Sequence, residues 1–219
     1  MSDPGRRKGT TVKTQGLIEA HEALWRGATE HPFLDGVREG TLPDGAFDEW
    51  LVQDYLFVLS GLVFQSRLAP RSPRRDQALV IGGLAALENE LGWFEEKAKE
   101  RNLSLENAVK HPTNKAYGDL FISLEDRSYA ANITALWAVE EAYLDAWTNA
   151  SPGASEYREF VEHWTAPEFA EYVGTLKEAA DAALAAAAEG EKNQAEASFL
   201  EVARLERDFW GIAVPGNVR

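Results

Sequence analysis

The chain has 219 residues, of which 45% are hydrophobic and 26% are charged, and its formal net charge is −14. This length and composition fit one globular domain and exclude a disordered chain. The strong negative charge argues against a nucleic acid or an anionic membrane surface as partner. No apolar run approaches the roughly 20 residues of a membrane span, and we expect a cytoplasmic protein.

The chain contains no cysteine, which excludes disulfides, thiolate metal sites and a cysteine nucleophile. The four histidines show no metal-binding spacing, since none pairs with another at i,i+3 or i,i+4 and no H-E-x-x-H sequence occurs. The Glu-x-x-His repeats of carboxylate-rich metal sites in helical bundles are missing as well. We therefore expect neither a metal nor a cofactor.

Apolar residues recur at helical spacing along nearly the whole chain, without a convincing strand pattern. Residues 1–13 should form a disordered tail, and 215–219 a second, short one. The pattern and its proline and glycine breaks predict helices at about 14–30, 44–68, 74–101, 104–123, 127–149, 154–164, 166–189 and 192–213. Long helices with short links indicate a compact antiparallel bundle, so residues 14–214 should form one all-α domain of about eight helices.

The predicted helix at 44–68 places a carboxylate among apolar side chains. Asp54, Phe57, Val58 and Gly61 share one of its faces. A carboxylate on the apolar side of a helix costs several kcal/mol unless it is hydrogen-bonded or paired. Asp54 therefore bonds a neighbouring helix or contacts a ligand, and the sequence leaves both interpretations open.

Two further aromatic residues stand among polar neighbours. Tyr117 occurs in HPTNKAYGDLF, and Trp164 occurs in EHWTAPEF. Aromatic side chains supply large buried area and also form stacking walls for flat ligands. Judged alone, each of the two is more often a core residue than a ligand contact.

The helix that contains ALWAVEEAYLDAW carries a second carboxylate on an apolar stripe. Leu136, Glu140, Tyr143 and Trp147 recur there at i, i+4, i+7 and i+11. This spacing predicts that Glu140 faces inward between large apolar groups. Glu141 lies about 100° further round the helix and is expected to be a solvated surface charge.

The last predicted helix ends in LERDFW, in which Glu206, Phe209 and Trp210 follow at i, i+3 and i+4. A carboxyl group desolvated by aromatic walls keeps its proton to higher pH, as a general acid at neutral pH requires. An ion pair of Glu206 with Arg204 or Arg207 is the alternative, and the sequence does not decide between them.

Inward carboxylates on three separate helices, with aromatic neighbours and no thiol, indicate a flat, neutral or weakly basic substrate. In such a pocket one carboxylate can anchor an amidine-like edge while the others move protons.

At these same segments the chain resembles the TenA (thiaminase II-like) family. The resemblance runs in order through HPFLDGVREGTLP followed by QDY, then PTNKAY, the helix with Trp137 and Glu140, WTAPEF and the closing LERDFW. It implies a heme-oxygenase-like helical bundle that forms a homo-oligomer, a tetramer or dimer. It also implies hydrolysis at the carbon attached to position 5 of 4-amino-2-methylpyrimidines in thiamin salvage.

Residue by residue, the resemblance assigns roles in binding and catalysis. Asp54 matches the aspartate that anchors the pyrimidine, and Tyr117 matches the tyrosine beside the ring. Glu206 matches the C-terminal catalytic glutamate. Phe57 and Trp164 fall where the family has aromatic walls of the pocket.

One departure from the family bears on the substrate. Members that cleave thiamin carry a cysteine on the helix that here reads LWAVEEAY, where this chain has Ala138 and Val139. We therefore do not expect thiamin cleavage. The cysteine-free branch has a glutamate nearby that resembles Glu140, and its members are associated with aminomethyl- or formylaminomethyl-pyrimidine hydrolysis. We expect Glu140 and Glu206 to be the catalytic pair and Tyr143 to be a further substrate-binding residue.

Two other functions stay open on the same bundle. One is an oxidase related to PqqC, against which the missing histidine clusters argue. The other is a non-catalytic pyrimidine-binding or regulatory protein, although the acidic charge and the lack of a helix-turn-helix signal make DNA binding a poor fit. The sequence does not indicate whether an amino or a formylamino leaving group is preferred.

Overall fold

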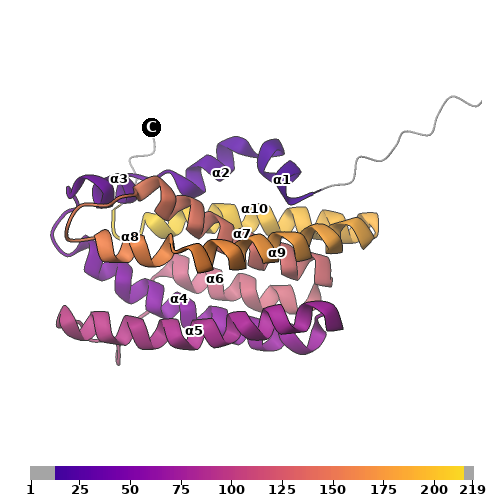
Figure 1. Cartoon of the computed structure of the whole chain (residues 1–219), viewed down its shortest axis with the longest axis horizontal. Coiled ribbons are helices and arrows are strands. Elements are labelled where there is room, and N and C mark those ends of the chain that lie inside the picture. Colours follow the sequence, from indigo (N-terminus) through magenta and orange to yellow (C-terminus); the bar gives the residue numbers. More distant parts are fainter. Residues whose placement is uncertain (1–12, 215–219) are drawn as a thin grey trace, which may run out of the picture.

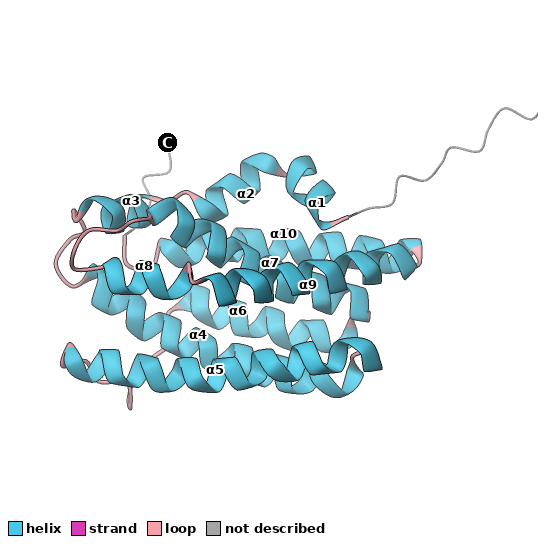
Figure 2. Ribbon diagram, in the orientation of Figure 1, coloured by secondary structure: helices cyan, strands magenta, loops and turns pink. Residues whose placement is uncertain are grey.

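The computed structural model describes residues 13–214, which form helices and loops (Figures 1 and 2). Their α-helices are α1 (Thr14–Ala20), α2 (Glu22–Thr29), α3 (Pro32–Glu39), α4 (Ala46–Leu68), α5 (Arg74–Glu100), α6 (Pro112–Ser123), α7 (Tyr129–Ala150), α8 (Arg158–Trp164), α9 (Pro167–Ala186) and α10 (Glu189–Trp210). Short 3-10 turns, η1 (Ala69–Arg71) and η2 (Leu124–Asp126), follow α4 and α6. The predicted all-α, single-domain bundle is confirmed. The tails expected at 1–13 and 215–219 lie outside the described residues, apart from residue 13.

The long helices run side by side along the molecule, with α1 to α3 along one edge and α5 along the opposite edge (Figure 1). Helix α7 is central, because α9 and α10 pack along it and α2, α3 and α8 also contact it. Its alanines Ala131, Ala135, Ala138, Ala142 and Ala146 are fully buried. Alanine favours helix and its small side chain lets neighbouring helices approach closely. No helix of residues 13–214 is long and apolar enough to cross a membrane.

The helix predicted at 14–30 is divided in two at His21. The backbone of His21 leaves the helical conformation, with φ −126° and ψ 33°. Its ring nitrogen Nε2 lies 2.8 Å from Glu196 on α10. On the N-terminal side of the break, Thr14 donates from its backbone nitrogen and its hydroxyl to Asp181 on α9, both at 2.8 Å. These contacts with two other helices favour the change of direction, which local periodicity did not indicate.

Helix α3 occupies a segment that the sequence pattern indicated as a break. The ring of His31 caps it by accepting from the backbone nitrogen of Phe33 at 3.1 Å, and Gly40 ends it in the left-handed conformation, with φ 69°. Burial lowers the pKa of His31 to about 4, so the ring is neutral and can accept this bond. Proline and glycine mark the two ends of this short helix.

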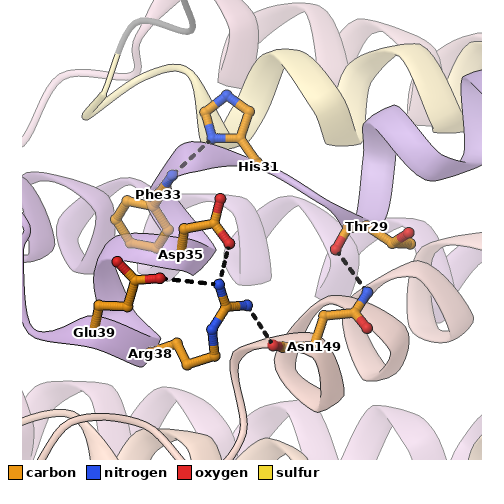
Figure 3. Close-up of polar contacts among 7 residues, drawn as sticks. All are labelled: Thr29, His31, Phe33, Asp35, Arg38, Glu39 and Asn149. Carbon is orange, nitrogen blue, oxygen red and sulfur yellow. Dashed lines mark hydrogen bonds and ion pairs between the residues drawn. The ribbon is translucent and has the colours of Figure 1, made fainter.

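Polar contacts tie α3 to the end of α7 (Figure 3). Arg38 donates to Asp35 at 2.6 Å, to Glu39 at 3.3 Å and to the backbone carbonyl of Asn149 at 3.1 Å. The side chain of Asn149 in turn donates to the carbonyl of Thr29 at 3.1 Å. The HPFLDGVREG segment therefore has a structural role at the end of the bundle.

The helix predicted at 104–123 begins only at Pro112. His111 caps it, because its ring nitrogen Nδ1 accepts from the backbone nitrogen of Thr113 at 3.2 Å. His111 precedes a proline, and the helical conformation is disfavoured for a residue in that position. The preceding loop is held by Gln53 of α4, whose side chain donates to the carbonyl of Val109 and accepts from the backbone nitrogen of His111, both at 2.9 Å. The remaining helices begin and end within a few residues of the prediction.

Candidate active site

A cavity of about 380 Å³ opens between α4, α5, α7 and the α8–α9 pair. Its size falls in the range of small-molecule sites, about 300–1,000 Å³. Most of its wall is apolar. Of the expected site residues, those that line it are Asp54, Phe57, Glu140, Tyr143 and Trp164. The structure thus brings residues from three predicted helices to a single cavity.

Tyr117 and Glu206, the other two expected site residues, lie behind this wall. They are 1% and 3% exposed, and the hydroxyl of Tyr117 donates to the carboxyl of Glu206. The ring of Phe57, which lines the cavity, packs edge-on against Tyr117, with centroids 4.7 Å apart. Arg207, one of the alternative partners for Glu206, pairs instead with Asp208 at 2.7 Å.

Asp54 makes both kinds of contact that the sequence left open. It is 2% exposed, lines the cavity and accepts from the hydroxyl of Tyr143 on α7 at 2.5 Å. Burial raises the pKa of Asp54 to about 8, and the charges of Glu90 and Glu140 act in the same direction. The Tyr143 bond opposes this rise. Asp54 therefore holds a proton over much of the neutral range.

Tyr143 and Trp164 belong to a group of aromatic rings at one end of the cavity. The ring of Tyr143 stacks on Trp210 at 6.0 Å and meets Trp164 edge-on at 5.5 Å. Trp164 in turn packs against Trp147 at 4.5 Å. These rings fix the position of the Tyr143 hydroxyl, and through it the carboxyl of Asp54.

The helix-face assignment of the two adjacent glutamates on α7 agrees with the geometry. Glu140 lines the cavity, and burial, with a smaller effect of the Glu90 charge, raises its pKa to about 8. Glu141 is not among the lining residues, but it is only partly exposed. It accepts from Trp137 at 3.0 Å and lies 3.8 Å from Lys177. It is therefore a structural hydrogen-bonding group, and the expected free solvation of its charge was wrong.

Glu206 has a raised pKa for the same main reason as the other two carboxyls. Burial raises it to about 8, the Tyr117 hydrogen bond opposes the rise, and the charges of Asp54 and Glu140 add to it. The pKa values of Glu140 and Glu206 are both raised to about 8, so these values alone do not distinguish a general base from a general acid. A positively charged or proton-sharing ligand would be needed to stabilise the charged forms of this cluster.

Glu90 of α5 is a cavity carboxylate that we did not predict. Its two oxygens accept from the ring nitrogens of His163 at 2.8 Å and of Trp164 at 2.7 Å. The ring of His163 is stacked on Trp93 with centroids 4.0 Å apart. Helix α5 carries several glutamates, and nothing in its pattern distinguishes Glu90 from its exposed neighbour Glu88. Only the packing of α5 against α8 reveals it.

Glu206→Gln should change how stability depends on pH. The pKa of Glu206 is about 8 in the folded protein and near the ordinary carboxyl value in the unfolded chain, so folding takes up a proton between these values. The stabilisation is present below the ordinary pKa and is lost as the pH rises through about 8. In this window one such carboxyl lowers the free energy of unfolding by up to about 1.4 kcal/mol per pH unit.

Urea unfolding followed by circular dichroism across this pH window measures the effect. We expect the free energy of unfolding of Glu206→Gln to fall less steeply with pH than that of the unsubstituted protein. Glu88→Gln is the control, because Glu88 is exposed on α5. Equal slopes for Glu206→Gln and the unsubstituted protein would contradict a raised pKa.

The fold and the cavity together define a helical-bundle protein with a small-molecule site between its helices. The chain belongs to the TENA/THI-4/PQQC family, whose model matches residues 18–215. The predicted membership is thereby confirmed.

Individual relatives are similar to this protein over most of its length. A TenA homologue from Pyrococcus furiosus has the same fold, with a TM-score of 0.87 and 33% identity over 91% of this chain and 98% of that one. A probable bifunctional TENA-E protein from Glycine max is 32% identical over 94% of both chains. An aminopyrimidine aminohydrolase from Halalkalibacterium halodurans is 26% identical over 90% of this chain and 93% of that protein.

Proposed function

We propose that this protein hydrolyses an aminomethyl- or formylaminomethyl-pyrimidine from thiamin breakdown to the hydroxymethylpyrimidine, in thiamin salvage. The observation that carries the proposal is the group of buried carboxyls with raised pKa values beside an aromatic-walled cavity. The likeness to an aminopyrimidine aminohydrolase and to a TENA-E protein supports it.

Asp54 binds the aminopyrimidine edge in this proposal. One carboxyl oxygen accepts from the 4-amino group, and the other shares a proton with the adjacent ring nitrogen. A pKa of about 8 suits this role, because the proton can lie on either partner at neutral pH. The Tyr143 hydroxyl holds the carboxyl in place at 2.5 Å, and the rings of Phe57 and Trp164 provide the walls for the flat ligand.

The two glutamates divide the proton transfers. Glu140, at the cavity surface, positions a water molecule and takes its proton as the water oxygen bonds to the methylene carbon. The bond from that carbon to the nitrogen breaks, and Glu206 gives the nitrogen a proton. Ammonia leaves in the aminomethyl case and formamide in the formylaminomethyl case. Glu206 is not among the residues that line the cavity, so in this proposal its proton reaches the substrate only after side chains of the wall move.

Incubation of the pure protein with the aminomethyl-pyrimidine, the formylaminomethyl-pyrimidine and thiamin, side by side, tests the proposal. Product mass should show hydroxymethylpyrimidine from at least one of the first two substrates. Thiamin should remain intact, because Ala138 and Val139 stand where thiamin-cleaving members have their cysteine. Rapid thiamin cleavage would mean that another nucleophile has replaced the thiol, and absence of product from every substrate would contradict the hydrolase proposal.

The alternatives predict different results in the same assay. The family model also covers PqqC, so membership alone does not separate a hydrolase from an oxidase. A binding or regulatory protein would retain the pyrimidine unchanged. The clustered carboxyls with raised pKa values favour hydrolysis, since simple binding of a pyrimidine needs only Asp54. The cytoplasmic location and the homo-oligomer, tetramer or dimer, stay predictions from the sequence.

A further inference from the structure

Glu90 lines the cavity but has no part in the binding and proton transfers proposed above. Its two oxygens accept from Nε2 of His163 and Nε1 of Trp164, both on α8. The packing of their rings fixes both donors. His163 stacks on Trp93 with centroids 4.0 Å apart, and Trp164 meets Trp50 edge-on at 5.4 Å. The position of the Glu90 carboxylate is therefore set before any ligand enters.

The helix register places Glu90 at the same end of the cavity as Asp54. Helices α4 and α5 are joined by the short η1 turn and pack along each other, so they run in opposite directions. A β-carbon at Gly61 of α4 would lie 3.8 Å from Leu87 of α5. This contact places Glu90 level with Val58, which is one turn from Asp54. At about 1.5 Å per residue, one turn is roughly 6 Å along the axis.

Contacts between side chains also join Glu90 to the site at Asp54. Trp164 donates to Glu90 and meets the ring of Tyr143 edge-on at 5.5 Å. Tyr143 in turn donates to Asp54. The Glu90 charge contributes to the raised pKa values of Asp54 and Glu140, which agrees with three carboxyls close to one another. A ligand bound at Asp54 is therefore within reach of Glu90.

The surroundings of Glu90 suit a ligand group that carries an N–H or a positive charge. A carboxylate has about four acceptor positions, and the two donors on α8 use two of them. No lysine or arginine occurs among those residues of 13–214 that line the cavity. The nearby carboxyls of Asp54 and Glu140 make the charge of Glu90 unfavourable there. A glutamate that only joined α5 to α8 would leave this repulsion uncompensated.

We infer that Glu90 binds the nitrogen on the methylene carbon of the substrate, the nitrogen that leaves in the proposed reaction. The methylene carbon is attached next to the ring carbon that bears the 4-amino group, so this nitrogen lies close to the edge that Asp54 binds. Both proposed substrates carry an N–H there. When Glu206 gives this nitrogen a proton, the Glu90 carboxylate stabilises the positive charge that the nitrogen then carries. The inference rests on the proposed function and makes it more specific.

Titration calorimetry with two ligands tests this role of Glu90. One ligand is the aminomethyl-pyrimidine, and the other is its methyl analogue, which has a methyl group in place of the aminomethyl group. Both are measured in the Glu206→Gln background, in which turnover is slow. Adding Glu90→Gln should raise the Kd of the aminomethyl-pyrimidine by roughly 10- to 150-fold, the effect of losing a hydrogen bond to a charged group. The Kd of the methyl analogue should stay within about 2-fold, because it makes no such bond.

Glu168→Gln in the same background is the matched control. Glu168 also lines the cavity, but it is exposed on α9. Its replacement should leave the Kd of both ligands within about 2-fold, since no hydrogen bond to the ligand is lost. If Glu168→Gln weakened binding of the aminomethyl-pyrimidine as much as Glu90→Gln did, the effect would come from the general negative charge of the cavity. The inference would then be wrong.

A second measurement needs no change at Glu90. The Glu206→Gln protein itself should bind the aminomethyl-pyrimidine at least roughly 10-fold more tightly than the methyl analogue, because only the first ligand donates to the carboxylate. Equal affinity for the two ligands would overturn the inference. So would a Glu90→Gln variant with an unchanged circular dichroism spectrum that lost affinity for both ligands equally or for neither.

Turnover by the unsubstituted protein separates this inference from the hydrolase proposal. If the selective loss in Glu90→Gln were absent but turnover occurred, the hydrolase proposal would stand and the role of Glu90 would be wrong. If the selective loss were present without turnover, the hydrolase proposal alone would be contradicted. Failure of the unsubstituted protein to bind either ligand would overturn both.

Discussion

Glu206→Gln and Glu140→Gln should each lower the catalytic rate by roughly 10²–10⁴-fold, the usual worth of a positioned acid or base. Water is a weak nucleophile, and an amine leaves poorly without a proton, so the reaction needs both groups. Glutamine keeps the size of each side chain but neither gives up nor accepts the required proton. In Glu206→Gln the new carboxamide oxygen can still accept the hydrogen bond of Tyr117, so this variant should fold normally. Single-turnover rates measure the loss, and substrate Kd should change much less.

Two further variants test this prediction, a double variant and a control variant on the same helix. The double variant should be little worse than the poorer single one, since the two groups act on the same step. Glu141→Gln is the matched control on the same helix, because Glu141 bonds Trp137 and Lys177 and is not part of the cavity lining. A large loss in Glu141→Gln with normal Glu140→Gln would reverse the assignment of the helix face. Normal rates in both Glu140→Gln and Glu206→Gln would contradict acid–base catalysis by these residues.

Asp54→Asn should weaken pyrimidine binding by about 1.5–3 kcal/mol, roughly 10- to 150-fold in Kd, the range of a charge-assisted hydrogen bond. Asparagine can still accept from the Tyr143 hydroxyl and from the 4-amino group. It cannot share a proton with the ring nitrogen, and its amide N–H₂ offers only a weaker, neutral bond there. Titration calorimetry with the hydroxymethylpyrimidine product measures the change without interference from turnover.

Asp145→Asn is the matched control for this prediction. Asp145 is a half-buried carboxylate of α7 that accepts from Trp25 at 3.0 Å, and it is not among the residues lining the cavity. Its replacement should leave pyrimidine affinity unchanged. If Asp54→Asn also bound the product with unchanged affinity in a folded protein, Asp54 would serve only to hold Tyr143, and the anchoring role would be wrong.

The sequence predicted those parts of the site that depend on periodicity within one helix. Asp54 and Phe57 share a face of α4, and Glu140 and Tyr143 share a stripe of α7, and all four line the cavity. Each pair stands on a helix whose apolar side is unambiguous. Periodicity therefore indicates which polar group is directed inward.

Residues whose environment comes from other helices could not be predicted in this way. Glu90 and Tyr172 stand on α5 and α9, where polar residues are frequent and packing alone decides which of them reaches the cavity. The position of the Gln65 side chain depends on Gly83 of the neighbouring helix, because a β-carbon there would lie 2.8 Å from Oε1 of Gln65. The raised pKa values of Glu140 and Glu206 likewise follow from burial in the assembled bundle, not from local sequence.

In the fold, too, features set by periodicity within one helix were predictable, and features set by contacts between helices were not. The long helices were predictable, whereas the break at His21 and the short α3 depend on contacts with α10, α9 and α7. A helix as short as Pro32–Glu39 has little intrinsic stability. Its caps and its contacts with the end of α7 stabilise it, and the same proline and glycine equally suit a turn.

The most direct test of the account is hydrolysis of the aminomethyl- or formylaminomethyl-pyrimidine in water labelled with heavy oxygen. Attack of water at the methylene carbon places one heavy oxygen in the hydroxymethylpyrimidine, and mass spectrometry detects it. We expect labelled product from the unsubstituted protein and a rate lower by roughly 10²–10⁴-fold from Glu206→Gln. Unlabelled hydroxymethylpyrimidine, or no product from either substrate, would contradict the proposed hydrolysis.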